Sequence, residues 1–331
     1  MRRSLILLCL LASYPAIPGT SPRRSETFGD WSTPSPVASL NTDSNDMYAV
    51  LSKDELTVYF TSDRQGTLGL EDLWFATRDS VDAPWGPAQN MSVINSTFAD
   101  SLPMLSYDDH VMFFQSTRTE GACGKGDIWM TRRRDKRSQD WEVPINLGCG
   151  LNTGANETAP AFFENPETGE VTLYYGSDRP GGLGDFDVYA SVVGEGGYFG
   201  PGGLVREFSS SRRDTRIFIS RDGLEAFVTS DRLNGQGLID IWTSTRDTLS
   251  DTWPTPIDVP SPVNSTCDDG SPWLSRDGTT LYFFSNRADF GCGTRDIWYT
   301  TREKIKQENA IQAIVRRFNR MVARLTGELL S

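Results

Sequence analysis

Apolar and polar positions along this chain follow one short pattern that returns five times. Each copy has an apolar stretch, a Ser-x-Asp turn, paired aromatic residues, Ser-x-Arg, a glycine-containing stretch and then Asp-Ile-Trp or a close variant. The aspartates that open this last element recur every 53 to 60 residues, at Asp72, Asp127, Asp187, Asp240 and Asp296. Repeats of this length, built from short strands, indicate an architecture in which each unit packs against its neighbours.

Each unit is expected to form a small antiparallel sheet. Asp222-Gly223 and Asp277-Gly278 stand before runs of apolar and aromatic residues, and such sequences predict hairpins because Asp-Gly tolerates a tight turn. A third strand begins at each Asp-Ile-Trp. A fourth strand is expected near a leading aromatic residue, at Trp31, Trp85, Trp141, Tyr198 and Trp253. Four short strands per unit, repeated radially, predict an all-β five-bladed propeller.

The two ends of the repeat region suggest how the ring closes. Residues 31–41 precede the first hairpin, and the last copy ends after its Asp-Ile-Trp strand with no fourth strand behind it. We therefore expect the N-terminal strand to complete the last four-stranded blade, in a propeller that spans residues 31–302. The third copy departs from the pattern, because residues 164–170 replace its Ser-x-Asp turn.

Residues 274–287 read Leu-Ser-Arg-Asp-Gly-Thr-Thr-Leu-Tyr-Phe-Phe-Ser-Asn-Arg. This segment resembles the WD40-like (PD40) propeller repeat of the TolB family, and the other four copies agree with it. The resemblance covers roughly residues 31–302 and implies a five-bladed propeller. It also implies a protein-binding scaffold, although members of the repeat family occur beside enzymes and a fold does not dictate an activity.

The sequences outside the repeats have their own patterns. Residues 1–19 combine two arginines with an apolar stretch, as a signal peptide does, and residues 20–30 are expected to be a flexible lead-in. Apolar residues recur at steps of three and four in residues 303–331, which predicts an amphipathic helix with a net positive charge. That helix could dock on the acidic propeller or self-associate, with contact to a membrane surface as the less favoured alternative. The oligomeric state is open.

Four cysteines remain once the signal peptide is removed. Cys123 and Cys292 precede Asp-Ile-Trp, whereas Cys149 and Cys267 flank the Asn that opens the next unit. Because these loops emerge on one face of a propeller, we predict the disulfides Cys123–Cys149 and Cys267–Cys292, with four buried thiols as the alternative. Disulfides would place the protein in the periplasm or outside the cell.

Several kinds of chemistry are disfavoured. The single histidine, His110, falls at a predicted hairpin tip, which leaves no Ser-His-Asp triad and no His-based metal site. The glycines at 181–184 invite comparison with calcium-binding repeats, but Phe186 breaks the spacing, so we expect no cofactor. The net charge of −12 argues against nucleic acid as a partner.

Carboxylate side chains are the main candidates for a binding or catalytic role in this sequence. Five residues after the opening Asn or Ser of each unit stands an acid, at Asp46, Asp100, Glu157, Asp214 and Asp269. These five acids should form a ring at one mouth of the channel. A ring of this kind could hold a cation or a sugar, but residues repeated in every blade favour a structural role, in which the acids accept hydrogen bonds from backbone amides or from the Ser-x-Arg arginines.

Ligand binding is expected where the fivefold symmetry breaks. The candidates for binding are Arg212, Arg213, Arg216, Asp268 and Trp273. The sequence-based hypothesis is an exported, non-enzymatic scaffold that binds a protein or a glycan through the loop face of the propeller. The alternative is a glycoside hydrolase that uses carboxylates at the channel mouth, with Asp100, Glu157, Asp268 and the unmatched Asp185 as candidates.

Overall fold

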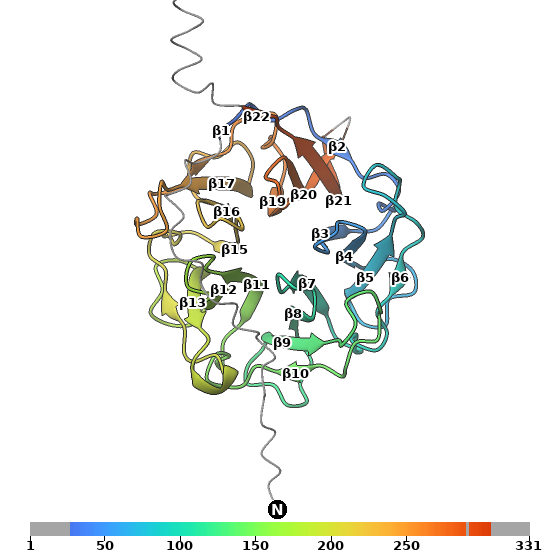
Figure 1. Cartoon of the computed structure of the whole chain (residues 1–331), viewed down its shortest axis with the longest axis vertical. Helices are drawn as coiled ribbons and strands as arrows, with labels where there is room; N and C mark the ends of the chain where they lie inside the picture. Colours follow the sequence, from blue (N-terminus) through green and yellow to red (C-terminus); the bar gives the residue numbers. More distant parts are fainter. Residues whose placement is uncertain (1–26, 289–290, 306–331) are drawn as a thin grey trace, which may run out of the picture.

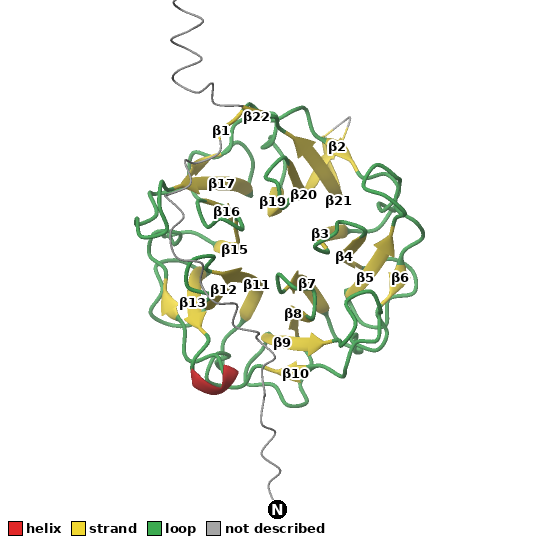
Figure 2. Ribbon diagram, viewed as in Figure 1, coloured by secondary structure: helices red, strands yellow, loops and turns green. Residues whose placement is uncertain are grey.

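The computed structural model describes residues 27–288 and 291–305, which form a ring of antiparallel sheets around a central channel (Figure 1). Each of the five blades has four strands, so the architecture predicted from the sequence is confirmed (Figure 2). From the centre outwards the strands are β3 (Asp46–Leu51), β4 (Thr57–Ser62), β5 (Asp72–Thr77) and β6 (Gln89–Asn90) in blade 1; β7 (Asp100–Leu105), β8 (Val111–Ser116), β9 (Asp127–Arg132) and β10 (Ile145–Asn146) in blade 2; β11 (Glu157–Glu164), β12 (Val171–Ser177), β13 (Asp187–Val192) and β14 (Gly203–Leu204) in blade 3; β15 (Asp214–Ile219), β16 (Glu225–Ser230), β17 (Asp240–Thr245) and β18 (Ile257–Asp258) in blade 4; and β19 (Asp269–Leu274), β20 (Thr280–Ala288), β21 (Gly291–Thr301) and β2 (Ser35–Pro36) in blade 5.

The N-terminal strand closes the ring, as the sequence predicts. β2 pairs with β21 in blade 5, with Ser35 opposite Tyr299 and Pro36 opposite Trp298 (Figure 1). Asn41 adds a second contact across the closure, because its Nδ2 donates to the carbonyl of Ile297 at 3.0 Å while Ile297 N donates to its Oδ1 at 2.9 Å. Equivalent pairs join the other Asn residues to the preceding blade, at Asn95, Asn152 and Asn264. The closing contact is therefore the ordinary contact between blades.

A second pairing joins the two ends of the described chain. β1 (Thr27–Phe28) pairs with β22 (Lys304–Ile305), and the guanidinium of Arg302 lies 3.8 Å from the centre of the Phe28 ring. These short strands fall in segments that the sequence assigns to the flexible lead-in and to the C-terminal helix. The sequence-based assignment missed them because each strand depends on a partner about 275 residues away. The predicted signal peptide at residues 1–19 and the predicted C-terminal helix beyond residue 305 lie outside the described residues.

The core lies between adjacent blades. All six residues of β7 are buried, as are the second-strand aromatic residues Tyr59, Phe60, Phe114 and Phe283. Both faces of the middle strands are apolar because each blade is covered by a neighbour on either side. A single 3₁₀ turn, η1 (Glu195–Gly197), connects β13 to β14, and no α-helix occurs within residues 27–288 and 291–305.

The Ser-x-Arg arginine ties each blade together. In blade 1, Arg64 donates from Nε to Ser62 Oγ at 3.0 Å and from Nη2 to both the Leu40 carbonyl and Asp46. Its guanidinium also lies 5.4 Å from the centre of the Trp74 ring. One cation thus connects three strands and the loop that leads into the blade. The equivalent arginines are Arg118, Arg179, Arg232 and Arg287.

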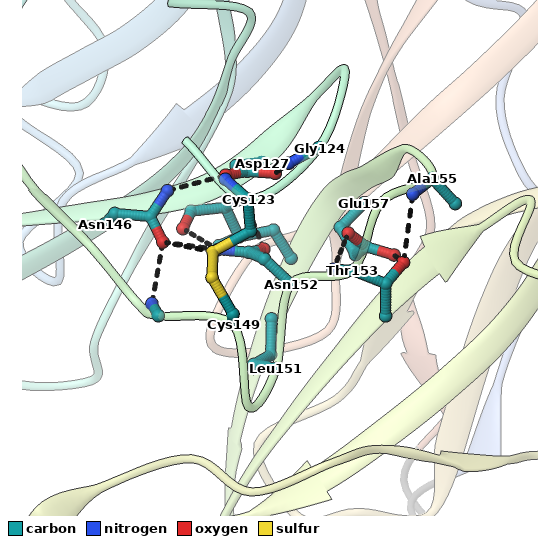
Figure 3. The surroundings of a disulfide bond; sticks show 12 residues. Cys123, Gly124, Asp127, Asn146, Cys149, Leu151, Asn152, Thr153, Ala155 and Glu157 are labelled. Atoms are coloured by element: carbon teal, nitrogen blue, oxygen red, sulfur yellow. Dashed lines mark hydrogen bonds between the residues drawn. A yellow bond between two sulfur atoms is a disulfide. The ribbon is translucent and has the colours of Figure 1, made fainter. Parts of the chain in front are cut away.

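Two disulfides fasten loops at one face of the ring. Cys123 is bonded to Cys149 and Cys267 to Cys292, with Cα separations of 5.4 and 5.6 Å, which confirms the predicted disulfides. Figure 3 shows the first of them beside Asp127, whose carboxylate accepts the amide of Cys123 at 2.6 Å. Asn146 Nδ2 donates to the same carboxylate at 2.7 Å (Figure 3). The repeated Asp-Ile-Trp aspartate therefore caps the preceding loop, and the disulfide covalently reinforces that closure.

Candidate functional site

The five acids of the ring are buried, and their carboxylates are not exposed to solvent. Asp100 is fully buried, and its Oδ2 accepts the amide and hydroxyl of Ser96 at 2.6 and 2.7 Å while its Oδ1 accepts Arg118 Nη2 at 2.5 Å. Glu157 is equally buried and accepts Arg179 Nη2 at 3.1 Å. The same arrangement holds at Asp46, Asp214 and Asp269. Because no substrate can reach these oxygen atoms, we give Asp100 and Glu157 no catalytic role.

The five blades differ from one another at two equivalent positions. One lies just before the Asp-Ile-Trp aspartate, and the other lies just before the acid of the ring. One residue before the Asp-Ile-Trp aspartate or its equivalent, the five blades carry Glu71, Gly126, Phe186, Ile239 and Arg295. Immediately before the first strand they carry Asn45, Ala99, Asn156, Arg213 and Asp268. These strand ends lie at the same mouth of the channel, so charged side chains from blades 1, 4 and 5 share one region. We call Tyr48, Glu71, Arg213, Asp268 and Arg295 the channel-mouth cluster.

An ion pair forms one side of the channel-mouth cluster. Arg295 Nη2 lies 3.0 Å from Asp268 Oδ2, and the two side chains are 34% and 15% exposed. The guanidinium of Arg295 also lies 5.1 Å from the centre of the Phe284 ring, and its backbone amide donates to Asn45 Oδ1 at 3.2 Å. Asp268 is therefore held in place as a hydrogen-bond acceptor while it remains accessible to solvent.

A carboxyl group with a shifted pKa lies beside this ion pair. Burial raises the pKa of Glu71, and the carboxylate of Asp63 raises it further. Arg295 and a hydrogen bond with Ser101 oppose the shift without cancelling it. Asp63 is itself held by Asn45, whose backbone amide and Nδ2 both donate to it at 2.8 Å. Glu71 therefore keeps its proton to a higher pH than an ordinary glutamate does.

Tyr48 extends the cluster into the channel. Burial raises the pKa of its hydroxyl, and the negative charge of Glu71 adds to this effect, so the hydroxyl stays neutral and can donate a hydrogen bond. Its ring packs edge-on against Phe284 at 5.7 Å between centres. The backbone of Tyr48 has a φ of 61°, and the equivalent residues Leu102, Ala159 and Ser271 share this conformation, so it belongs to the repeated inner strand.

The sequence-predicted binding residues lie in different surroundings. Arg213 is exposed at the channel mouth, 4.6 Å from the centre of the Phe186 ring, and Arg212 is exposed in the same loop. Arg216 is buried deeper in the channel, where its Nη2 donates to the Pro103 carbonyl at 3.0 Å. Trp273 is buried near the opposite end of β19, packed against Phe218 and Tyr282. The structure thus places Arg213 beside Phe186 and Asp268 beside Arg295, and it buries Trp273 away from both.

Sequence reasoning missed Glu71. An alignment of the five copies contains the signal, because Glu71 is the one acid at a position that otherwise holds glycine, an apolar residue or arginine. The raised pKa could not be read from the sequence, because it depends on burial and on the neighbouring blade.

Two more acids with raised pKa values lie at the opposite mouth. Burial raises the pKa of Glu55 and of Asp109, whose φ angles of 59° and 64° match those of Gly223 and Gly278 at the same turn position. Asp109 accepts the amide of Lys53 at 2.9 Å, and Glu55 accepts a backbone hydrogen bond from Arg276, so each acid fastens a neighbouring turn.

The space beside these acids does not fit a substrate. The adjoining pocket of about 50 Å³ has room for only a few water molecules. It opens onto a shallow depression of about 580 Å³ between the turns of blades 1 and 5. We therefore assign Glu55 and Asp109 to contacts between blades.

The described part of the chain has no cluster of His, Cys, Asp or Glu side chains arranged for a metal ion and no helix suited to crossing a membrane. Among residues 27–288 and 291–305, no group of three or more His, Cys, Asp or Glu side chains is arranged to hold a metal ion. The glycine-rich loop compared with calcium sites folds onto Asp187, which accepts the amides of Leu183 and Gly184 at 2.6 and 3.1 Å. No helix in this part is long and apolar enough to cross a membrane.

Comparisons with known proteins establish the fold. No family model and no curated protein matches the chain. Among solved structures, a thermostable family-43 glycoside hydrolase is 11% identical over 81% of this chain and 91% of its own, with a TM-score of 0.53. The catalytic domain of the family-62 α-L-arabinofuranosidase from Coprinopsis cinerea is 11% identical over 82% of this chain and 96% of its own, with a TM-score of 0.54.

A TolB-like protein from Agrobacterium tumefaciens is also similar, at 14% identity over 80% of each chain and a TM-score of 0.45. Other similar structures are again arabinofuranosidases or an arabinanase. The glycoside hydrolases with TM-scores above 0.5 contradict the leading sequence-based hypothesis of a non-enzymatic scaffold and favour its alternative. The hypothesis was wrong because the repeat motif specifies how a blade is built, and blades of this kind carry unrelated sites.

Proposed function

We propose that this protein is an exported glycoside hydrolase, in which Glu71 donates the proton and Asp268 is the second carboxylate. The observation that carries the proposal is the placement of Glu71, with its raised pKa, beside the Arg295–Asp268 ion pair at the channel mouth. Hydrolysis of a glycosidic bond needs one protonated and one ionised carboxyl group on either side of that bond. Environments that push two carboxyl groups toward different protonation states meet this requirement.

Each member of the channel-mouth cluster has a role in this mechanism. The Glu71 carboxyl transfers its proton to the glycosidic oxygen as the bond to the anomeric carbon breaks. The Asp268 carboxylate takes a proton from the attacking water, whose oxygen then bonds to the anomeric carbon. Tyr48 offers a neutral hydroxyl as a hydrogen-bond donor, and the guanidinium of Arg213 can bind sugar hydroxyl groups. Arg295 orients Asp268 through their ion pair.

Two further findings support the proposal. The similar solved structures with TM-scores above 0.5 include arabinofuranosidases, so arabinose-containing glycans are the first substrates to test. The two disulfides favour a periplasmic or secreted protein, from which residues 1–19 are removed as a signal peptide. The segment at residues 274–287 resembles the WD40-like repeat, and we interpret the repeats as the scaffold that carries this site.

The test is hydrolysis by the mature protein of nitrophenyl glycosides and of arabinose-containing polysaccharides, with release of reducing ends as the readout. Glu71→Gln and Asp268→Asn should each lower kcat at least about 100-fold, because a positioned acid or base contributes about 10²- to 10⁴-fold. Neither change should lower the unfolding temperature appreciably.

Asp140→Asn is the control, because Asp140 is an exposed acid outside the channel-mouth cluster and its replacement should leave kcat unchanged. Full activity in Glu71→Gln would refute the assignment of the proton donor. A wild-type protein that releases no sugar from the whole panel would refute the proposed function.

A further inference from the structure

A buried arginine spans the central channel. The third residue of each inner strand lies at a β-bulge, where the pairing register shifts, and these five residues are Tyr48, Leu102, Ala159, Arg216 and Ser271. The inner strands surround the centre of the ring (Figure 1). Arg216 leaves β15 in blade 4, and its Nη2 reaches the Pro103 carbonyl on β7 in blade 2. Because these blades are not adjacent, the guanidinium crosses the channel.

The charge of Arg216 is not compensated by the described residues. The residue is 3% exposed, and burial lowers its pKa to about 10, so it is still protonated at neutral pH. Its Nη1 has no hydrogen-bond partner and it forms no ion pair within residues 27–288 and 291–305. An unpaired buried charge is strongly unfavourable, and each Ser-x-Arg arginine avoids this cost by pairing with an acid.

Arg133 shows how this protein accommodates a buried arginine that lacks an ion pair. It is 4% exposed, and its Nε donates to the Asp109 carbonyl at 2.9 Å. Its Nη1 donates to the Tyr59 hydroxyl at 2.7 Å and to the Ser138 carbonyl at 2.8 Å. Neutral acceptors therefore satisfy Arg133, whereas Arg216 bonds to the Pro103 carbonyl and its Nη1 has no acceptor among the described residues.

A second unsatisfied group lies at the same level of the channel. Ser271 occupies the same strand position as Arg216 in the neighbouring blade and is 2% exposed. Its amide donates to Thr229 Oγ1 at 2.8 Å, but its Oγ has no partner among the described residues. β15 and β19 pack against one another. The Nη1 of a protonated guanidinium and a hydroxyl group, each without an acceptor among the described residues, require an anion or an equivalent acceptor.

We propose that the channel binds one small monoatomic anion, such as chloride, between Nη1 of Arg216 and Oγ of Ser271. Both atoms are enclosed by protein, so an extended ligand such as a glycan carboxylate cannot reach them. The other residues at this level favour the same ligand, because Leu102 and Ala159 carry no charge and burial keeps the Tyr48 hydroxyl neutral. This site does not depend on the proposed hydrolase activity.

The test is thermal unfolding of the mature protein in sodium gluconate, with sodium chloride or bromide replacing gluconate at constant ionic strength. A ligand that binds only the folded state raises Tm with ligand concentration, so Tm should rise with halide and level off. Arg216→Met should abolish the halide response and Ser271→Ala should weaken it. Arg133→Met is the matched control, which should lower Tm and keep the halide response. Crystals soaked in bromide should show an anomalous peak beside Arg216.

Equal Tm values in gluconate and halide together with no bromide peak would overturn the proposal. A halide response that persists in Arg216→Met would overturn it as well, because the effect would then arise elsewhere. If Arg216→Met does not fold, Arg216→Lys and the bromide peak in wild-type crystals decide the question. A protein without hydrolase activity that binds bromide at Arg216 would support this site and refute only the proposed function.

Discussion

At the residue scale, one arginine in each blade holds its strands together. Arg118 is paired with the fully buried Asp100, while Arg132 in the same blade is paired with Glu142 at the surface. The two ion pairs have similar lengths, 2.5 and 2.6 Å, but their environments differ. Breaking a buried pair leaves an uncompensated charge in the interior, whereas water compensates a broken surface pair.

Arg118→Met should therefore lower the free energy of unfolding by about 3–5 kcal/mol. Arg132→Met, the matched control, should lower it by less than about 1 kcal/mol. Urea denaturation of the mature protein measures both changes. Similar losses in the two variants would contradict the structural role that we assign to the Ser-x-Arg arginines.

The pH dependence of stability gives a second test at the residue scale. Burial, with a contribution from Asp46, raises the pKa of Asp296 from its ordinary value of 3.8 to about 6. Between these values the folded protein binds more protons than the unfolded chain, so this group makes stability fall as pH rises from about 4 to about 6. Asp296→Asn should remove that contribution.

The stability difference between Asp296→Asn and wild type should change over about pH 4 to 6 and remain constant above about pH 7. Urea midpoints measured across this range report the effect. Asp140→Asn, at an exposed acid, serves as the control and should follow the wild-type profile. A constant difference between Asp296→Asn and wild type from pH 4 to 7 would show that the pKa of Asp296 is not raised.

At the scale of the element, the two-residue strand β2 determines whether the ring is closed. It supplies the fourth strand of blade 5, and Asn41 just after it bonds to Ile297 on β21. A chain that begins at residue 42 would leave β21 with an unpaired edge and would lose the contact between blades 5 and 1. A chain that begins at residue 27 keeps both contacts.

The truncation to residue 42 should lower the unfolding temperature of the whole propeller, while the truncation to residue 27 should leave it close to that of the mature protein. Since each blade packs against two neighbours, the loss should be cooperative. Calorimetry would show one transition shifted as a unit. A small separate transition above an unchanged main one would contradict the role of β2 as a closure for the ring.

Sequence patterns predicted the blades well because a blade is a local unit. The spacing of Asp-Ile-Trp and of Ser-x-Arg lies within each copy, so the number of blades, the closing strand and both disulfides followed from it. β1 and β22 were missed because each strand has only two residues and its pattern is too short to recognise. Trp273 was expected to be exposed, and burial against Phe218 of the neighbouring blade excludes that.

At the scale of the whole molecule, closure of the ring creates the candidate site. Glu71 in blade 1 and Asp268 in blade 5 are nearly 200 residues apart in the sequence, and Arg295 interacts with both of them only because the first and last blades are adjacent. The acids that attracted attention in the sequence, Asp100 and Glu157, are buried by the same closure. The acids that recur in every blade are therefore structural, and the functional candidates are acids that occur at positions where the blades differ.

The sequence alone determined the blade, the number of copies, the closing strand and the disulfides, because each depends on residue types at short, repeated spacings. Only the tertiary structure decided which acid has a raised pKa, which arginine lacks a partner and which side chains share the channel mouth. Those properties depend on burial and on charges contributed by other blades. Burial of this kind arises when five similar sheets close into a ring, and it has no signature in the local order of residues.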